Sequence, residues 1–288
     1  MILHDISEAK QYLPSVNLTM ANDRFTDFFS RAQGWLVSRV IGETVASKID
    51  NNQPIGADDP RLPLATLCRR VIAEKALLDA IPEMDMQLTE AGFAVQDNDN
   101  FSPASAQRVE RLLATLPGRI AMDVDALVEY LFDHTLENEY RLEWYGSDQF
   151  KKLTSCFVPY WKEMESGLKK YRQQTEGFDY ERYYNMLRPG ANETKALAAY
   201  YISEAEFDRL LSLYRDCTLT DVQKTAVSHL KEAVLAELAC AFGQARNEVI
   251  ECRNVMLSDP DSFTEFKASK AFPKRSINLD GGKTVNFL

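Results

Sequence analysis

Apolar residues recur along most of the chain at steps of three and four positions, and Gly and Pro are scarce. Such spacing places the apolar side chains on one face of an α-helix. The strongest pattern predicts a helix from about Arg24 to Ile49 with two neighbouring apolar stripes. The stripes comprise Phe25, Phe29, Ala32, Leu36 and Val40, and Val37, Ile41, Val45 and Ile49. A face this wide predicts burial on two sides, either in a bundle or between subunits.

Turn-forming residues divide the rest of the N-terminal region. The segment from Asn51 to Leu62 contains Pro, Gly, Asn and Asp and is predicted to be a loop. Pro63 suits the first turn of the helix that follows, and Pro82 is predicted to end that helix. The polar stretch over residues 89–103 is predicted to be irregular.

Three further helices are predicted from their periodicity, over residues 104–116, 122–138 and 220–245. The last of them has Phe242 among its inward positions. The helical period in every long segment predicts an all-α, or mainly α, fold in the form of a helical bundle.

Breaks in the pattern divide this bundle into three parts. Pro117-Gly118 closes an N-terminal helical domain over residues 1–118, and a second helical domain spans residues 119–257. After Asp259-Pro260 the periodicity ends. Residues 258–288 are therefore predicted to be an extended tail that is either disordered or lies on a neighbouring molecule.

The tetrapeptide "ISEA" occurs at residues 6–9 and again at 202–205. At both places a serine can cap a helix: Ser203 is followed by Glu206, as in a capping box, and Ser7 has no such acid. Segments 67–81 and 230–244 also share their spacing of apolar and small residues, although the distances between the paired segments differ. Two interpretations stay open: two related helical halves, or unrelated helices with similar start signals.

Aromatic residues concentrate in residues 140–201, which hold nine of the twelve tyrosines. A base-stacking platform would also need a basic groove. Burial in a core or in a subunit contact is the favoured interpretation, because aromatic side chains dominate both kinds of surface. The candidate interface residues are Phe28, Trp35, Val37, Ile41, Trp144, Tyr145, Trp161, Tyr183, Tyr184 and Phe272.

Composition and charge narrow the function classes. The 288 residues contain no apolar run long enough for a membrane span and no secretory leader, so a soluble protein without membrane contact is predicted. A net charge of -10 argues against a surface that grips nucleic acid. Five cysteines without a C-x-x-C pair indicate a reducing compartment and predict neither disulfides nor a zinc site.

Motifs with known chemistry are incomplete. "DGGKT" at residues 280–284 lacks the further Gly and the following helix of a phosphate-binding loop. "DNDN" at residues 97–100 lacks the Gly and the bidentate Glu of a calcium loop.

One predicted helical face carries Glu129, Asp133 and Glu137 with His134 beside them. A di-metal bundle would need Glu-x-x-His on paired helices, so a solvated acidic face is the favoured interpretation. Three histidines and no Gly-x-Ser-x-Gly elbow leave little for acid-base or nucleophilic catalysis. No catalytic, cofactor or metal site is predicted, and the chain is not expected to be an enzyme.

The N-terminal third has a recognisable order: "DISEAKQYLPS", a polar step "MANDRF", and a long helix "FTDFFSRAQGWLVSRVIG". This order resembles the opening of head-tail connector (adaptor) proteins of tailed bacteriophages. The matching positions are Glu8, Ala9, Lys10, Leu13, Ala32, Trp35 and Gly42. The later segments "LPLATLCRRVIAEKALLDAIPEMDMQLTEAGFAV" and "SAQRVERLLATL" also resemble an uncharacterised group of prophage proteins from gut bacteria, so the resemblance covers about residues 3–116.

The resemblance implies a mainly helical virion subunit, made in the host cytoplasm, that forms a ring between portal and tail. Its implied partners are further copies of itself and portal, tail or other neck proteins, while DNA passes through without specific binding. An acidic lumen would suit that passage, because cationic contacts add affinity for each phosphate. Two alternatives stay open: a helical adaptor with a protein-binding groove, and an enzyme with a dispersed site.

Overall fold

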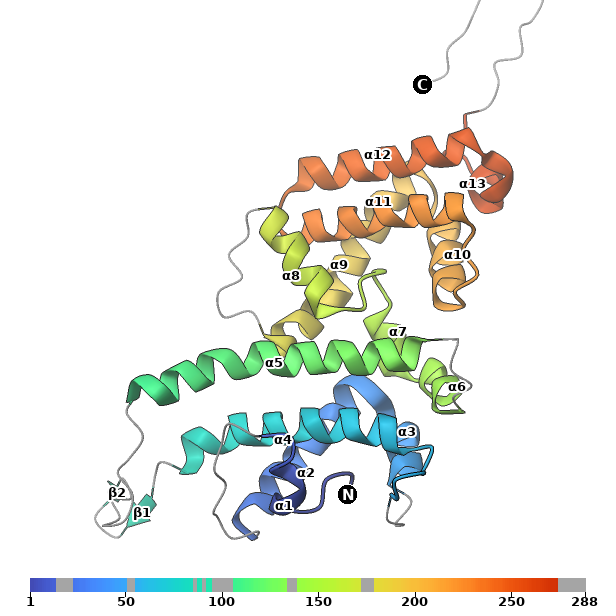
Figure 1. Cartoon of the computed structure of the whole chain (residues 1–288). Coiled ribbons are helices and arrows are strands. Elements are labelled where there is room, and N and C mark those ends of the chain that lie inside the picture. The colour runs from blue at the N-terminus through green and yellow to red at the C-terminus, as the bar shows by residue number, and fades with distance from the viewer. Residues whose placement is uncertain are drawn as a thin grey trace, which may run out of the picture. The chain divides into compact units, whose positions relative to one another are not determined.

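The computed structural model describes residues 1–13, 23–50, 55–84, 87–89, 92–94, 106–133, 139–171 and 179–273 (Figure 1). Across these ranges the chain is mainly helical, which confirms the predicted fold class. The β structure found there is one short hairpin, in which β1 (Gln87–Thr89) pairs antiparallel with β2 (Gly92–Ala94). This hairpin lies within the segment 89–103 that was predicted to be irregular and in the residues just before it.

The chain divides into two compact units. Unit 1 comprises Met1–Lys169 and Gln174–Leu187, and unit 2 comprises Lys170–Gln173 and Arg188–Leu288. The division predicted at residue 118 differs from this one. Residue 118 lies in the middle of a helix of unit 1, so the chain has no domain boundary there.

Unit 1 contains three long helical segments. Its elements are α1 (Ile6–Ala9), α2 (Asp23–Leu36), the π-helical segment η1 (Val37–Ile41), α3 (Gly42–Ile49), α4 (Leu62–Met84), the hairpin, α5 (Ala106–Phe132), α6 (Glu139–Gly146), α7 (Asp148–Leu153), α8 (Trp161–Lys170, to residue 169) and the start of α9 (Tyr180–Tyr201). Helix α4 packs against both α2 and α5, and Figure 1 shows α4 and α5 running alongside each other.

The long helix predicted over residues 24–49 is present, although its middle is π-helical. Helix α2 continues directly into η1 and then into α3. Every residue of the two predicted apolar stripes is buried by other parts of the same chain. The wide apolar face is therefore covered inside the bundle, which removes the need for a subunit contact at this face.

Pro82 and Pro117 lie inside helices, contrary to the prediction that they end them. A proline removes one backbone hydrogen bond and kinks a helix, but packing along the helix can hold both sides together. Leu116 and Ile120, which flank Pro117, are buried. The packing of α5 against α4 thus joins the two helices predicted over residues 104–116 and 122–138 into one.

The start of α4 agrees with the sequence. Residues 55–61 form turns, while residues 51–54 of the predicted loop lie outside the described residues. Helix α4 begins at Leu62, and Pro63 occupies its first turn, where a missing backbone N–H costs nothing.

A buried carboxyl group lies where α4 meets α5. Glu74 is almost fully buried and forms an ion pair with Arg119, while its Oε2 atom has no hydrogen-bond partner. The neighbouring carboxylate of Asp123 accepts from Arg70 at 3.3 Å. Burial, together with the charge of Asp123, raises the pKa of Glu74 to about 7 against the opposing effect of Arg119. A proton on Glu74 would allow it to donate to Asp123, which gives Oε2 a partner.

Unit 2 is a helical assembly formed by the rest of α9, α10 (Glu204–Arg215), α11 (Asp221–Leu238), α12 (Phe242–Ser258), the 3-10 turn η2 (Pro260–Ser262) and α13 (Thr264–Ala268). Helices α11 and α12 lie side by side (Figure 1). The predicted single helix over residues 220–245 is therefore two helices. The chain reverses at Ala239–Ala241, where Cys240 has a φ of 56°. Phe242 opens α12 and is 62% exposed, so its predicted inward position is wrong.

The C-terminal part is ordered further than predicted. Residues 260–268 form η2 and α13 in place of an extended tail, and Phe263 and Phe266 are fully buried. Glu206 of α10 holds this segment, because its Oε2 accepts the backbone N–H groups of Glu265 and Phe266, each at 2.9 Å. Residues 274–288 of the predicted tail lie outside the described residues.

The two "ISEA" copies occupy different positions at their helix starts. Asp5, and not Ser7, caps α1 by accepting the N–H of Glu8 at 2.8 Å, so the first copy lies inside its helix. Ser203 caps α10 as predicted, accepting the N–H of Glu206 at 3.1 Å. The carboxylate of Glu206 turns to α13, however, and does not close a capping box. A shared capping role therefore does not explain the repeat, and a duplication stays a prediction.

Candidate functional site

The π-helical segment η1 shapes the most distinctive part of unit 1. A π-helical turn shifts its backbone hydrogen bonds, and such segments are frequent at functional sites. Side chains from α6 and α7 bind the carbonyls of η1: the indole Nε1 of Trp144 donates to Val40 at 2.7 Å, and the amide of Gln149 donates to Ser38 at 3.3 Å. Two later helices thus recognise the irregular backbone of η1.

Gly42 ends this segment in a conformation that favours glycine. Its φ is 76°, and a Cβ added there would lie 3.0 Å from Oε1 of Gln149. Any other residue would combine backbone strain with a steric contact. A glycine is therefore favoured at the position where η1 ends.

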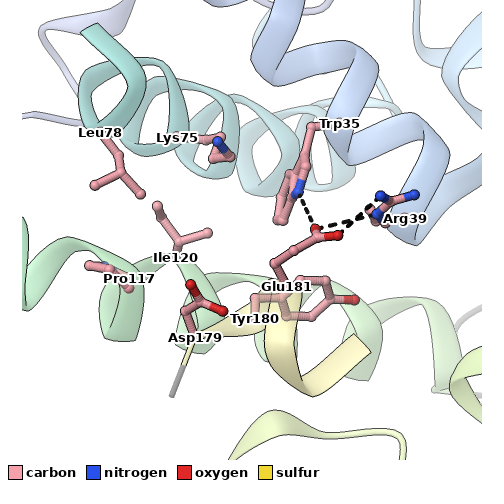
Figure 2. A pocket seen from close by; sticks show the side chains of 9 residues that line it. All are labelled: Trp35, Arg39, Lys75, Leu78, Pro117, Ile120, Asp179, Tyr180 and Glu181. Atoms are coloured by element: carbon pink, nitrogen blue, oxygen red, sulfur yellow. Dashed lines mark hydrogen bonds and ion pairs between the residues drawn. The ribbon is translucent and has the colours of Figure 1, made fainter. Parts of the chain in front are cut away.

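A cavity of about 340 Å³ lies beside η1 in unit 1 (Figure 2). Helices α2, η1, α4, α5 and the start of α9 supply its lining residues, which are Trp35, Arg39, Lys75, Leu78, Pro117, Ile120, Asp179, Tyr180 and Glu181. Volumes of this size are typical of small-ligand or side-chain pockets.

Glu181 links the polar residues of the cavity by hydrogen bonds. Figure 2 shows its carboxylate directed toward Trp35 and Arg39. Its Oε2 accepts from the indole Nε1 of Trp35 at 3.1 Å and from Nε of Arg39 at 3.3 Å, and its Oε1 accepts from Nη2 of Arg39 at 3.0 Å. Partial burial acts to raise the pKa of Glu181, but the hydrogen bonds from Arg39 and Trp35 outweigh it and hold the pKa below its usual value. Glu181 is thus ionised and attaches α9 to α2 and η1.

Aromatic rings form another wall. Trp35 and Tyr180 meet edge to face with their ring centroids 5.4 Å apart. The ammonium group of Lys75 lies 5.7 Å from the Trp35 ring centroid and pairs with Asp79 at 2.5 Å. Burial raises the pKa of Tyr180 well above its ordinary value, so this phenol stays neutral.

The remaining lining is apolar, with one acidic group at its edge. Leu78, Pro117 and Ile120 supply the apolar surface. Asp179 immediately precedes α9, and its Oδ1 accepts the backbone N–H of Arg182 at 2.8 Å. Aromatic faces, an apolar surface and carboxylates together suit an aromatic or cationic group.

The predicted interface residues have mostly become core. Burial within the chain covers Phe28, Val37, Ile41, Trp144, Trp161, Tyr183 and Tyr184. These predictions are corrected, because side chains covered by their own chain cannot meet a partner in this conformation. Most of the aromatic side chains listed here are therefore core residues. The buried hydroxyl of Tyr183, for example, donates a hydrogen bond to the carbonyl of Val158 at 3.1 Å.

Three of the predicted interface residues keep partial exposure: Trp35, Tyr145 and Phe272. Trp35 lines the cavity, so it is the predicted residue that the structure brings to the site. Tyr145 stacks on Phe150 at 4.4 Å, and Phe272 meets Phe266 edge to face at 5.4 Å.

Other sequence candidates are not assembled into a site by the described residues. Glu129 and Asp133 lie at the end of α5, whereas His134 and Glu137 fall outside the described ranges, as do residues 97–100 and 280–284. Among the residues that the structure describes, no cluster of His, Cys, Asp and Glu has the arrangement of a metal site. None of the described helices combines the length and the apolar character that crossing a lipid bilayer requires.

A second feature that sequence reasoning missed is an exposed aromatic group in unit 2. Tyr200 is 79% exposed and meets Tyr201 edge to face at 4.9 Å. The guanidinium of Arg246 donates to the Tyr201 hydroxyl at 2.5 Å and lies over its ring. Phe242 precedes Arg246 by one helical turn and is therefore on the same face of α12. We call Tyr200, Tyr201, Phe242 and Arg246 the aromatic-arginine surface.

Comparison with known proteins adds one match. Residues 36–152 match the model of a family of unknown function, DUF6712. The chain is similar to this family over that segment. The segment begins at the end of α2 and contains η1, Lys75 and Gly42, but not Glu181. No curated protein and no solved structure matches the chain.

Proposed function

We propose that this chain is a structural protein of the head-tail connector, or neck, of a bacteriophage or prophage. It assembles into a ring between portal and tail within the virion, after synthesis in the host cytoplasm. The resemblance of residues 3–116 to head-tail connector proteins is the reason for proposing this particular assembly. The family match over residues 36–152 falls largely on the same region but brings no function with it.

The observation that carries the assembly is the exposure of apolar side chains on both units after the core is complete. Met122 and Leu142 of unit 1 are 62% and 77% exposed, and unit 2 has the aromatic-arginine surface. A ring built from head-to-tail contacts needs two different surfaces on each subunit. Exposed apolar groups can mark interaction sites, and Tyr200 and Phe242 of unit 2 are 79% and 62% exposed.

The distribution of charge supports passage of DNA through such a ring. Unit 1 has 29 acidic and 18 basic residues, whereas unit 2 has 14 and 15, so the net negative charge of the chain belongs to unit 1. A lumen lined by unit 1 would repel phosphates and avoid the counterion release that strengthens binding to DNA. This arrangement would let DNA slide without being held.

Mass photometry of the full chain tests the proposal. The chain is measured across a concentration series, alone and with a portal protein of the same phage or prophage. Closed assembly predicts one dominant large species with a fixed subunit number. A monomer at every concentration, both alone and with portal, would contradict the proposal.

A helical adaptor that binds an unrelated protein is the second candidate, and the cavity of unit 1 favours it. Such an adaptor would stay monomeric and bind one partner at a defined ratio. The same measurement separates the two functions, because only the connector gives a homo-oligomer of fixed size.

A further inference from the structure

We propose that helix α9 is a hinge between the two units, with Pro189 as the point at which it bends. The inference concerns the single chain and does not rest on the proposed ring. Each unit keeps its own fold when the hinge bends.

Helix α9 belongs to both units. Residues Tyr180–Leu187 lie in unit 1, and the helix continues from Arg188 to Tyr201 in unit 2. Pro189 lies inside this helix, next to the boundary. Proline has no backbone N–H and its ring crowds the preceding turn, so it is a common site of sharp helix bends. The point at which α9 bends most easily therefore coincides with the boundary between the units.

The first part of α9 is fixed to unit 1. Glu181 pairs with Arg39 of η1 at 3.0 Å, and the hydroxyl of Tyr183 donates to the carbonyl of Val158 at 3.1 Å. Leu187, the last residue of this part, is fully buried. These contacts make this part of the helix move with unit 1.

The second part of α9 is fixed to unit 2. A Cβ added at Gly190 would lie 2.8 Å from the side chain of Leu238, so this glycine allows α9 and α11 to pack closely. Ala198 is fully buried, and Lys195 pairs with Asp208 of α10 at 2.9 Å. This part of the helix therefore moves with unit 2.

Between the two fixed parts, α9 is exposed at Arg188 and Pro189. The proline inside α5 differs, because Leu116 and Ile120 on its two sides are both buried in unit 1. Packing of one unit on both sides of a proline holds the helix rigid there. At Pro189 each side of the helix packs in a different unit, so packing within a unit does not oppose a bend.

The chain also crosses the boundary at the end of α8. Lys170 pairs with Glu232 of α11 at 2.7 Å, and the hydroxyl of Tyr171 donates to the same carboxylate at 2.9 Å. These two residues belong to unit 2, whereas the preceding residues of α8 belong to unit 1. Compact units commonly change their orientation about a few connecting residues. A further connection beside α9 restricts the motion to a bend and opposes free rotation.

Two variants change the hinge in opposite directions. Pro189→Ala restores the missing N–H in a strong helix former and is expected to stiffen α9. Arg188→Gly adds backbone freedom at an exposed position and is expected to loosen it. The matched control is Pro82→Ala, which removes another exposed proline from inside a helix, in α4, where both sides belong to unit 1. Circular dichroism melting curves confirm that each variant is folded.

Double electron–electron resonance measures the distribution of distances between one spin label in each unit. The labels are attached to the exposed Cys240 of unit 2 and to an exposed site of α2 in unit 1, through Ser30→Cys. Cys217→Ser removes a partly exposed thiol that would also react. The labelled chain is diluted with an excess of unlabelled chain, so that distances within one chain dominate in any assembly.

The wild type is expected to give a broad distribution of distances. Pro189→Ala should narrow it, Arg188→Gly should broaden it, and Pro82→Ala should leave it as in the wild type. A narrow distribution in the wild type would overturn the hinge. So would a distribution that Pro189→Ala leaves unchanged, or one that Pro82→Ala narrows equally. None of these outcomes depends on ring formation, which the number of subunits tests separately.

Discussion

Unit 1 and unit 2 each use one glutamate to attach a segment that is distant in sequence, and the two glutamates behave in opposite ways. In unit 1, Glu181 attaches the start of α9 to Trp35 and Arg39, and its carboxylate keeps substantial exposure. In unit 2, Glu206 is completely buried, attaches α13 through two backbone N–H groups and pairs with Arg209 of its own helix.

The pKa values of these two groups follow their surroundings. The pKa of Glu181 is lowered, because hydrogen bonds from Arg39 and Trp35 outweigh limited burial. The pKa of Glu206 is raised, because complete burial outweighs the backbone donors and Arg209. Hydrogen-bond donors therefore keep a half-exposed carboxyl group ionised, whereas at a buried position the cost of desolvating the charge exceeds their effect. A buried carboxylate is nevertheless costly to remove, since its donors would stay unpaired.

The largest expected effect is at Glu206. Glu206→Leu leaves Nε of Arg209 and two backbone N–H groups of α13 without their acceptor, so it should lower the free energy of unfolding by about 3 to 5 kcal/mol. Urea unfolding followed by circular dichroism measures this loss. The control is Glu204→Leu on the same helix, where an exposed ion pair with Lys195 at 3.0 Å contributes less than about 1 kcal/mol. Equal losses in the two variants would refute the role given to burial.

The second effect is a pH dependence from Glu74. Its folded pKa of about 7 lies above the ordinary value of 4.5, so the folded state binds the proton more tightly than the unfolded state. The contribution of Glu74 to the free energy of unfolding is therefore greatest below pH 4.5. It falls as the pH rises toward 7, by up to about 3 kcal/mol.

Urea unfolding at a series of pH values measures the contribution of Glu74. The wild type minus the Glu74→Gln variant isolates it, because glutamine keeps the side chain shape and has no proton to lose. The difference should change across pH 4.5 to 7 in the direction given. A flat difference would show that Glu74 is not held protonated between α4 and α5.

The third effect compares two glycines of one helical segment. Gly42→Ala places a Cβ at a φ of 76° and against Gln149, and should destabilise unit 1 by about 1 to 3 kcal/mol. Gly34→Ala lies in α2 with open space around the new Cβ and should stabilise by up to about 1 kcal/mol. Thermal melting of both variants checks the opposite signs. Two shifts of the same sign would mean that the conformation at Gly42 is not required.

The smallest effect is at Glu181. Glu181→Gln keeps the side chain shape but removes the charge that Arg39 pairs with, and partial exposure limits the loss to about 1 kcal/mol or less. Because the folded pKa is lowered, this contribution is present above the ordinary pKa and is lost as the pH falls. The variant should therefore match the wild type in acid and differ near neutral pH. A constant difference across the acid range would contradict this.

The sequence predicted what depends on local periodicity. The apolar stripes of residues 24–49 and the start of α4 at Pro63 follow from spacing and from proline chemistry, and both are confirmed. The helix ends predicted at Pro82 and Pro117 are wrong. Proline disfavours a continuous helix locally, but the packing of α4 against α5 stabilises both helices through these residues. The turn at residues 239–241 contains no Gly or Pro, so no local signal separates α11 from α12.

The cavity could not be predicted from local sequence patterns, because its lining residues come from segments that are far apart in the sequence. Glu181 follows Trp35 by 146 positions, and nothing near either residue indicates the partner. Gly42 lies at the end of η1, but Gly34 of the same predicted helix lies in ordinary α-helix, so a glycine alone does not indicate the π-helical segment. The exposure of Phe242 could not be predicted for a different reason. Its spacing continues the apolar face of α11, but the turn at residues 239–241 places it at the start of a new helix, α12.

The most direct test of the connector proposal is electron microscopy of the full chain assembled alone or on its portal. Class averages are expected to show closed rings of one subunit number, and a reconstruction should show unit 1 and its acidic residues lining the lumen. Isolated monomers under both conditions, or a ring with a lumen lined by Lys and Arg, would contradict the account.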